Sequence, residues 1–406
     1  MLITLIVFLL ILSVLVLVHE LGHFIMAKKF NILVEEFGFG LPPRFIGKKI
    51  GETIYSINYL PIGGFVKLYG EDREEKEKKG KIPNDRAFYA RPPWQRTVVI
   101  IAGVVMNFLL ALIIISFMFT QGVLIPVKRV HIVNVDKESP AEIAGIKTND
   151  IVHEVNGEKI QSTTSFIELT KNNLGKEITL TIMRGDSLKH YKNINLDCNK
   201  CQYLQVRVIP RKDPPYNELP DKDIPEEMNF LTQFKSSLRK ILHIPEPEKI
   251  ISREGPIGVA ISDLETIVYT WYQAPIYGPI ESLNLSWQLI KGIGITLWKL
   301  ISFQSVAKDV AGPFGIAQIT AEAVRYGGVR DVLMLLGLLS LNLAIINILP
   351  IPALDGGRLL FVVIEGITKK KIKTDWERYV HQIGMIILLL LLFLVTINDL
   401  IRFISS

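Results

Sequence analysis

The chain has 406 residues, of which 49% are hydrophobic, and its 46 Lys and Arg against 40 Asp and Glu give a net charge of +6. This length allows two or more domains. The positive charge lies mainly between the apolar stretches, so it does not favour nucleic-acid binding, and the stretches themselves argue against an entirely soluble fold.

Four apolar stretches are each long enough to cross a lipid bilayer, which takes about 20 helical residues. A helix of a soluble protein needs a polar face, and these stretches have almost none. No basic residue precedes the first stretch and no small-residue cleavage site follows it, so we interpret it as a retained span and not as a signal peptide. With their flanking residues, the predicted spans are 1–27, 97–122, 331–352 and 380–400.

The positions of Lys and Arg predict how these spans are oriented, because basic residues concentrate in short cytoplasmic loops. Residues 28–96 hold 14 Lys and Arg against 9 acidic residues, and four lysines cluster at 369–373. Both segments are therefore expected in the cytoplasm, and residues 123–330 outside. The first and third spans then run in the same direction, and both end near the cytoplasmic face.

The segment 28–96 divides into two parts. Residues 34–68 are rich in β-branched, aromatic and glycine residues, which predicts strands and hairpin turns. Residues 71–81 form a dense run of charges that is typical of a solvated or disordered linker.

The external segment begins with a small domain, expected at 127–262 with a Pro- and charge-rich insertion at 212–252. Its order of strands and helices resembles a circularly permuted bacterial PDZ domain, with a closing strand within 255–262. PDZ domains bind peptides by strand addition, and a domain that only shields the site is the equal alternative. The signals are strands at 130–135 and 178–183, helices from Ser139-Pro140 and over 164–172, and a hairpin turn at Asn156-Gly157.

Residues 263–330 contain a stretch at 282–303 with two lysines and two tryptophans. This composition favours an amphipathic helix in the membrane interface. A fifth span is the alternative, and it would place Asp355 on the opposite side of the membrane from His19.

The only cysteines, Cys198 and Cys201, form a CxxC pair without a second pair to complete a zinc site. A hairpin disulfide is open to them outside the cytoplasm. We expect a structural or incidental role and no part in catalysis.

The strongest chemical motif is the HELGH sequence of residues 19–23. Residues four apart share a helix face, so His19 and His23 can bind one zinc ion while Glu20 acts as general base. The motif stands at the end of a hydrocarbon-like span, where ionisable residues are costly and usually functional. The alternative is that the two histidines only cap the span at the headgroup layer, but this does not explain why Glu20 stands between them.

A zinc protease needs a third protein ligand and an open position for water. Asp355 is the candidate, because the parallel orientation of the first and third spans brings it to the depth of His19. Pro350 and Pro352 end the helix there, and irregular backbone at membrane depth is tolerated where it lines a water-filled cavity.

Asn342 and Asn347 lie within the third span, where each amide needs a partner. They either hydrogen-bond between helices or bind the substrate backbone and the oxyanion.

Three sequence motifs and the single PDZ-like domain resemble the site-2 protease family of intramembrane zinc metalloproteases, in its bacterial regulator of sigma-E protease type. The resemblance covers nearly the whole chain except the insertion at 212–252. The chain departs from the family pattern at Val104, where proline is usual, although Asn107 is retained, and it has one PDZ-like domain where the best-known members have two. The motifs are HELGH at 19–23, FYARPPWQRTVVIIAG at 88–103 and NILPIPALDGG at 347–357.

The resemblance implies that His19, His23 and Asp355 hold one zinc ion and that Glu20 is the base. It further implies that the substrate is contacted by Asn342 and Asn347, and by a membrane-reentrant β-hairpin whose edge pairs with an unwound substrate. The hairpin glycines concerned are Gly38, Gly40, Gly63 and Gly64.

The expected fold is a polytopic α-helical membrane protein of about four transmembrane helices, with a membrane-associated β-hairpin region and an inserted extracytoplasmic α+β PDZ-like domain. The expected function is regulated intramembrane proteolysis in a bacterial inner membrane. Its partners would be single-span substrates, such as anti-sigma factors or remnant signal peptides, and the bilayer. The alternatives are a membrane scaffold without enzymatic activity and a zinc peptidase acting on soluble peptides at the cytoplasmic surface.

Overall fold

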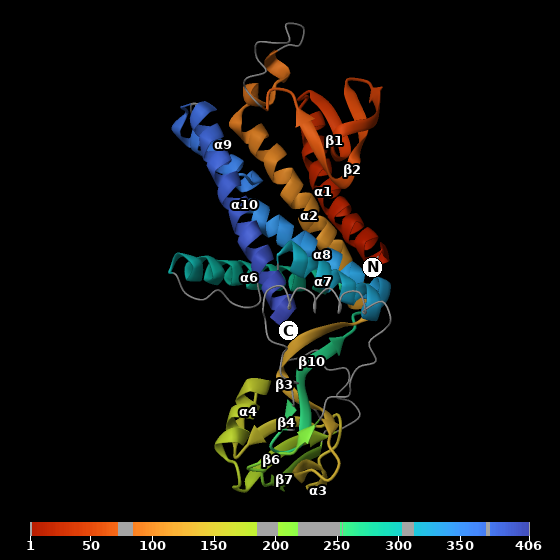
Figure 1. Cartoon of the computed structure of the whole chain (residues 1–406), viewed down its shortest axis with the longest axis vertical. Helices are drawn as coiled ribbons and strands as arrows, with labels where there is room; N and C mark the ends of the chain where they lie inside the picture. Colours follow the sequence, from red (N-terminus) through yellow and green to blue (C-terminus); the bar gives the residue numbers. More distant parts are fainter. Residues whose placement is uncertain are drawn as a thin grey trace. The chain divides into compact units, whose positions relative to one another are not determined.

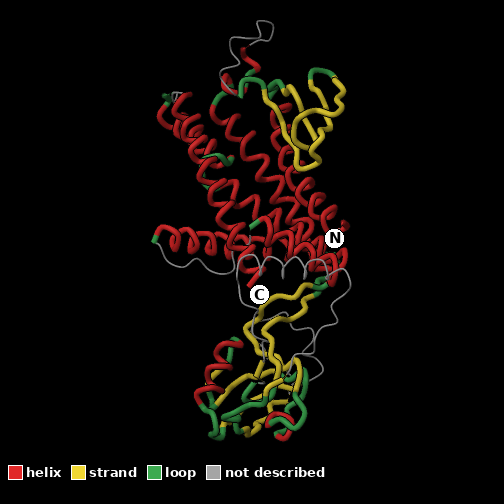
Figure 2. The backbone as a smooth tube through the Cα atoms, in the orientation of Figure 1, coloured by secondary structure: helices red, strands yellow, loops and turns green. Residues whose placement is uncertain are grey.

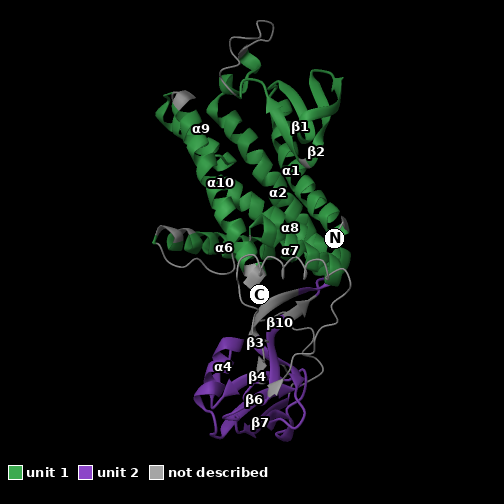
Figure 3. Ribbon diagram, viewed as in Figure 1, with its two compact units in different colours: residues 1–120, 270–406 green, residues 121–269 purple. Residues whose placement is uncertain are grey.

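A computed structural model describes residues 2–71, 84–184, 202–217, 252–253, 255–302, 312–370 and 374–405. Most of the charged run 71–81, both cysteines and most of the insertion 212–252 lie outside the described residues. The chain forms two compact units, residues 1–120 with 270–406 and residues 121–269 (Figure 3).

The first unit is built from helices and one β-hairpin. In Figure 1 the axes of its long helices α1, α2, α8 and α10 are roughly aligned, and α6 lies across them. The unit consists of α1 (Leu2–Lys29), β1 (Val34–Ile50), β2 (Thr53–Leu68), two short 3-10 turns (Asn84–Arg86 and Phe88–Ala90), α2 (Pro93–Gln121), α6 (Ala274–Ile301), α7 (Pro313–Glu322), α8 (Gly328–Ile348), α9 (Asp355–Thr368) and α10 (Thr374–Ser405).

Four helical stretches among the described residues are long and apolar enough to cross a membrane, which agrees with the predicted number of spans. The third stretch differs from the prediction, because it combines α7, a π-helical turn at Ala323–Gly327 and α8. Gly328, with a φ of 62°, marks the bend between them. The stretches are Ile3–Lys29, Pro93–Gln121, Pro313–Ile348 and Trp376–Ile401.

Helix α6 is not among these four stretches, so the described residues give no support to a fifth span. The helix begins at Ala274, earlier than the predicted 282, and continues through Pro279. Trp287 and Trp298 are exposed, and the Lys291 ammonium lies 5.2 Å from the Trp287 ring centroid. These features fit the predicted interfacial helix, whose place in a membrane stays a prediction.

The hairpin of β1 and β2 curls back on itself. The first part of β1 pairs with both ends of β2, since Gly38 lies opposite Ser56 and also opposite Phe65. The last part of β2 therefore has β1 on one edge and α1 along the other. This is the yellow strand pair beside the helices in Figure 2.

The second unit is a twisted sheet with two helices, and its short-range sequence signals are confirmed. Ser139 caps α3 (Pro140–Ile143) by accepting a hydrogen bond from the Glu142 N–H, and Asn156 and Gly157 form the β4–β5 turn with positive φ angles. The strand order is β10-β3-β4-β6-β7, with β5 paired to β4. The elements are β3 (Val123–Val135), β4 (Ile151–Val155), β5 (Glu158–Lys159), α4 (Thr163–Asn172), β6 (Ile178–Arg184), β7 (Gln202–Val208), the small pair β8 (Tyr216–Asn217) and β9 (Ser252–Arg253), and β10 (Val259–Ile267).

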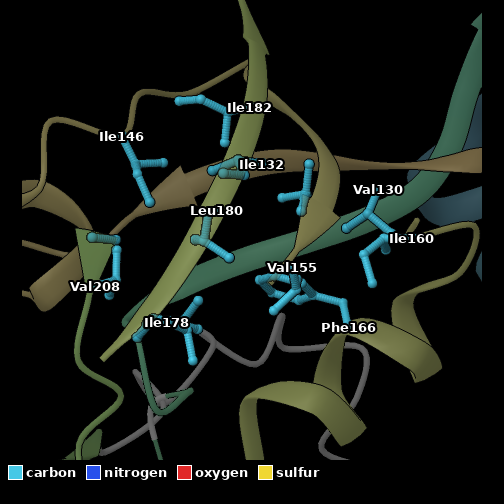
Figure 4. Close-up of a cluster of buried hydrophobic side chains, with 13 residues drawn as sticks. Val130, Ile132, Ile146, Val155, Ile160, Phe166, Ile178, Leu180, Ile182 and Val208 are labelled. Carbon is cyan, nitrogen blue, oxygen red and sulfur yellow. The ribbon is translucent and has the colours of Figure 1, made fainter. Parts of the chain in front are cut away.

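This second unit has its own hydrophobic core between the sheet and α4 (Figure 4). Phe166 of α4 and Ile178, Leu180 and Ile182 of β6 are at most 2% exposed. The expected closing strand is present as β10, which pairs antiparallel with β3. The likeness to a PDZ domain stays a prediction.

Candidate metal centre

Helix α1 continues without interruption through the HELGH motif and places both imidazoles on one face. His19 and His23 are only 6% and 9% exposed, and their Nε2 atoms lie 3.1 Å apart. Burial of two imidazoles at this distance leaves little water to satisfy them, so they need a shared partner.

Asp355 supplies the third polar group from the far end of the sequence. Helix α8 ends at Ile348 because Pro350 and Pro352 cannot continue it, and Asp355 opens α9. Its Oδ2 lies 2.8 Å from Nε2 of His19 and 3.3 Å from Nε2 of His23. The predicted convergence of residues 19, 23 and 355 is thus present in the structure.

The geometry of these three atoms fits a zinc ion. A tetrahedral zinc with ligands at about 2.0–2.1 Å separates neighbouring ligand atoms by about 3.3 Å, and the three distances here are 2.8, 3.1 and 3.3 Å. In its ionised form the Asp355 carboxylate would complete the set of three protein ligands.

A carbonyl and an amide of α2 orient the two imidazoles from behind. The Val99 carbonyl lies 2.8 Å from Nδ1 of His23, so this nitrogen carries the proton and leaves Nε2 free for a metal. The Asn107 amide lies 3.4 Å from Nδ1 of His19, and its buried Oδ1 has no hydrogen-bond partner among the described residues. Turning this amide over would let Oδ1 accept a hydrogen bond from an N–H at Nδ1 of His19, which leaves Nε2 of His19 free for a metal.

Two glycines allow α1 and α2 to meet at this point. A methyl group on Gly103 would lie 2.5 Å from Nε2 of His23 and 2.8 Å from Cε1 of His19. One on Gly22 would lie 2.3 Å from the Ala102 carbonyl oxygen. Neither contact is sterically acceptable, so both positions require glycine for close packing around the imidazoles.

Glu20 stands beside the two histidines and contacts the hairpin. Its carboxylate lies with His19 and His23 in a cluster whose ligand atoms are within 4.8 Å of one another. Its Oε2 accepts a hydrogen bond of 3.0 Å from the Val66 N–H of β2. The expected base therefore lies between the candidate metal position and the strand expected to hold substrate.

Backbone conformation and close packing explain why glycine stands at the four hairpin positions. Gly40 and Gly63 have φ angles of 82° and 75°, and a methyl group on Gly38 would meet the Phe65 ring at 2.3 Å. Gly63 and Gly64 face Val16 and Leu17 of α1. A direct contact of these glycines with substrate stays a prediction.

Asn342 and Asn347 both lie in α8, where Asn347 is buried and Asn342 is half-buried. They are five positions apart in the helix, so they project in different directions from it. Their proposed contact with substrate also stays a prediction.

A cavity of about 950 Å³ opens beside Asp355 between α2, α9 and α10. Arg96 of α2 and Glu365 of α9 form a buried ion pair of 2.9 Å, and Arg96 also lines this cavity. This pair ties the start of α2 to the helix that begins with Asp355.

Sequence reasoning missed several residues around the centre. Gly103, Val99 and the Val66 N–H carry no signal in a single sequence, because their roles arise from contacts between different elements. Asn107 was recognised only as part of a family pattern, although a lone amide in an apolar span is itself a signal that a partner is needed.

Comparison with known proteins agrees with this geometry. The model of the family described as peptidase family M50 matches residues 7–391. The chain is 29% identical to the regulator of sigma-W protease RasP of Bacillus subtilis (strain 168), with 98% of each chain covered, and 28% identical to the zinc metalloprotease RasP of Bacillus licheniformis, covering 98% of this chain and 99% of the relative. It is 31% identical to a Clostridium perfringens protein whose name contains the words zinc metalloprotease, with 96% of each chain covered.

Proposed function

This chain belongs to peptidase family M50, and from that premise we propose that it cleaves single-span membrane proteins within or beside the bilayer. It is a zinc metalloendopeptidase and a multi-pass protein of a bacterial membrane. The proposal concerns the residues that carry the reaction, the substrates and the sidedness of the site.

We assign His19, His23 and Asp355 as the zinc ligands. The observation that carries this assignment is the triangle of three buried ligand atoms, none more than 3.3 Å from another, contributed by two helices far apart in sequence. Three protein ligands would leave room for a water molecule on the metal, as in catalytic zinc sites.

Glu20 is assigned as the general base. A bound zinc ion supplies Lewis acidity that lowers the pKa of water to about 7 and polarises the scissile carbonyl. Glu20 accepts the proton of the attacking water and then donates it to the leaving amine. The Val66 N–H holds the carboxylate toward β2, on the side from which an extended substrate would approach.

The substrate must lose helical structure locally before it can be cleaved, because the peptide bonds of a helix are shielded. We propose that the hairpin of β1 and β2 holds the unwound segment extended by strand addition. Asn342 and Asn347 would bind its backbone. The proximity of β2 to Glu20 supports this arrangement.

We place the centre near the cytoplasmic face and the second unit outside, because of the lysine and arginine distribution. One relative is named a regulator of sigma-W protease. From the family resemblance, we propose that the substrates are anti-sigma factors already shortened by another protease, or remnant signal peptides.

The test compares substrate classes on purified protein in detergent or liposomes. A membrane-spanning peptide should be cleaved, and a soluble peptide of the same scissile sequence should be a poor substrate and a poor competitor. Equal turnover of the two peptides would favour a peptidase of the membrane surface.

In parallel, metal analysis should find one zinc per chain in the wild type and little in Asp355→Ala. A full zinc content in that variant would remove Asp355 from the ligand set.

A further inference from the structure

The segment 349–354, which leads into Asp355, adopts an unusual backbone. It is held locally by two hydrogen bonds, from the Ile351 N–H to the Leu349 carbonyl at 2.7 Å and from the Leu354 N–H to the Ile351 carbonyl at 3.2 Å. Ala353 has a φ of 75°, a left-handed conformation that costs a residue with a side chain about 1 kcal/mol or more. Such a conformation persists only where the surrounding structure fixes it.

One contact that fixes it comes from α10, a helix that contributes no candidate metal ligand. The Ala353 N–H donates a hydrogen bond of 3.0 Å to Nδ1 of His381. Nδ1 can accept only if the imidazole is neutral with its proton on Nε2. The ring is further held beside Phe361 of α9, with ring centroids 5.6 Å apart.

A second contact lies one turn further along the same face of α10. A methyl group on Gly384 would stand 2.2 Å from Cβ of Pro352 and 3.0 Å from its carbonyl carbon. The helix backbone therefore packs directly on Pro352. His381 and Gly384 thus contact two consecutive residues, 352 and 353, immediately before Leu354 and Asp355.

We propose that His381 is a positioning residue, which, together with the close packing at Gly384, holds the 349–354 segment so that Asp355 meets His19 and His23. This inference rests on the proposed role of Asp355 as a zinc ligand. His381 acts through the backbone of Ala353. Outer contacts of this kind change metal affinity because a ligand that must be ordered on binding binds more weakly.

Zinc affinity measured by competition with a chelator tests the proposal on the purified full-length chain. His381→Leu removes the acceptor and should weaken zinc binding by about ten- to a hundredfold. His381→Asn keeps an acceptor at the position of Nδ1 and should restore most of the affinity. Gly384→Ala should weaken binding in the same direction.

Matched controls separate positioning from general damage to the helices. Tyr379→Leu changes an exposed side chain of α10, and Gly366→Ala adds a methyl group whose nearest neighbour, Cβ of Pro93, is 3.4 Å away. Both should leave zinc affinity unchanged. If His381→Leu does not fold, the zinc affinities of His381→Asn and Gly384→Ala are compared instead. The proposal then expects near-wild-type affinity in His381→Asn and weaker binding in Gly384→Ala.

Wild-type zinc affinity in His381→Leu, beside loss of zinc in Asp355→Ala, would overturn this inference and leave the proposed function intact. Equal losses in the Leu and Asn variants would also overturn it, because the hydrogen bond would then not be the cause. Retention of zinc by Asp355→Ala would instead remove the proposed ligand role on which the inference rests.

Discussion

Gly103 determines how closely α2 can approach the two imidazoles of α1. We predict that Gly103→Ala displaces His23 and His19, because the added methyl group would lie 2.5 Å from Nε2 of His23. Overpacking of this kind costs about 1–3 kcal/mol, and the strain here falls on the candidate ligands. Metal analysis should show reduced zinc content, while Gly366→Ala retains it. Full zinc content in Gly103→Ala would mean that α2 can move away without disturbing the centre.

Glu20 offers a test of the chemistry apart from metal binding. Glu20→Gln keeps the shape of the side chain but cannot accept a proton, so the rate of cleavage should fall by a factor between about 10² and 10⁴. The Gln Oε1 can still accept from the Val66 N–H, so the contact with β2 should survive. Zinc content and turnover are measured on the same preparation. Substantial turnover by a zinc-loaded variant would exclude Glu20 as the essential base.

At the scale of elements, α10 also contacts the start of α7 within the first unit. Oδ2 of Asp399 accepts hydrogen bonds from the N–H groups of Gly312 and Gly315, at 2.8 and 2.9 Å, at the start of α7. A carboxylate is stabilising at a helix N-terminus because it pairs with N–H groups that have no partner within the helix. Asp399 is only 5% exposed, so water cannot replace it.

We therefore predict that Asp399→Leu destabilises the protein by about 1.5–3 kcal/mol, the contribution of a hydrogen bond to a charged group. Asp399→Asn keeps one acceptor oxygen and should lie between the wild type and the Leu variant. Asp331→Asn is the control, because Asp331 is an exposed carboxylate in the first turn of α8. The thermal unfolding midpoint is measured in detergent. A Leu variant as stable as the control would show that α7 is held by its apolar contacts alone.

The sequence predicts the elements of this molecule better than the contacts between them. The apolar spans, the cap of α3, the helix α4 and the turn at Asn156-Gly157 are signals carried by neighbouring residues, and the structure contains each of them. Helix α9 was not predicted, because a short amphipathic stretch after two prolines gives no clear boundary. The double pairing of β1 was also missed, since it depends on how far the hairpin curls.

In the candidate centre, too, the residues placed by local sequence signals can be predicted, and the contacts between distant elements cannot. His19 and His23 lie one helical turn apart, so helix geometry alone brings them together. Asp355 joins them only through the parallel direction of two spans. His381 could not be found from the sequence, because its contact with Ala353 depends on the rotation of α10 about its own axis. A lone histidine near the end of a span does not reveal that rotation.

At the scale of the whole molecule, the direction in which the chain crosses the membrane can be tested directly. Single cysteines replace Lys159 in β5 and Lys370 after α9, both exposed, in a chain whose Cys198 and Cys201 are changed to serine. We predict that Lys370→Cys is labelled only from the cytoplasmic side and Lys159→Cys only from the outside. Labelling of both from one side would contradict the parallel orientation that brings Asp355 to the depth of His19.

Two hydrogen bonds between α1 and β2 restrict how this protein can change in length during evolution. Ser13 donates to the Pro61 carbonyl at 3.1 Å, and Glu20 accepts from the Val66 N–H. Seven residues of helix between these contacts rise about 10 Å, whereas five residues of extended strand would cover about 16 Å. Between the two hydrogen bonds, Gly63 has a φ of 75° and departs from extended backbone, which shortens the path of the strand. An insertion or deletion within 61–66 would move the Val66 N–H away from Glu20, and one within 53–57 would disturb the pairing with 36–39. We therefore expect viable length changes in this hairpin at its turn, between Ile50 and Thr53.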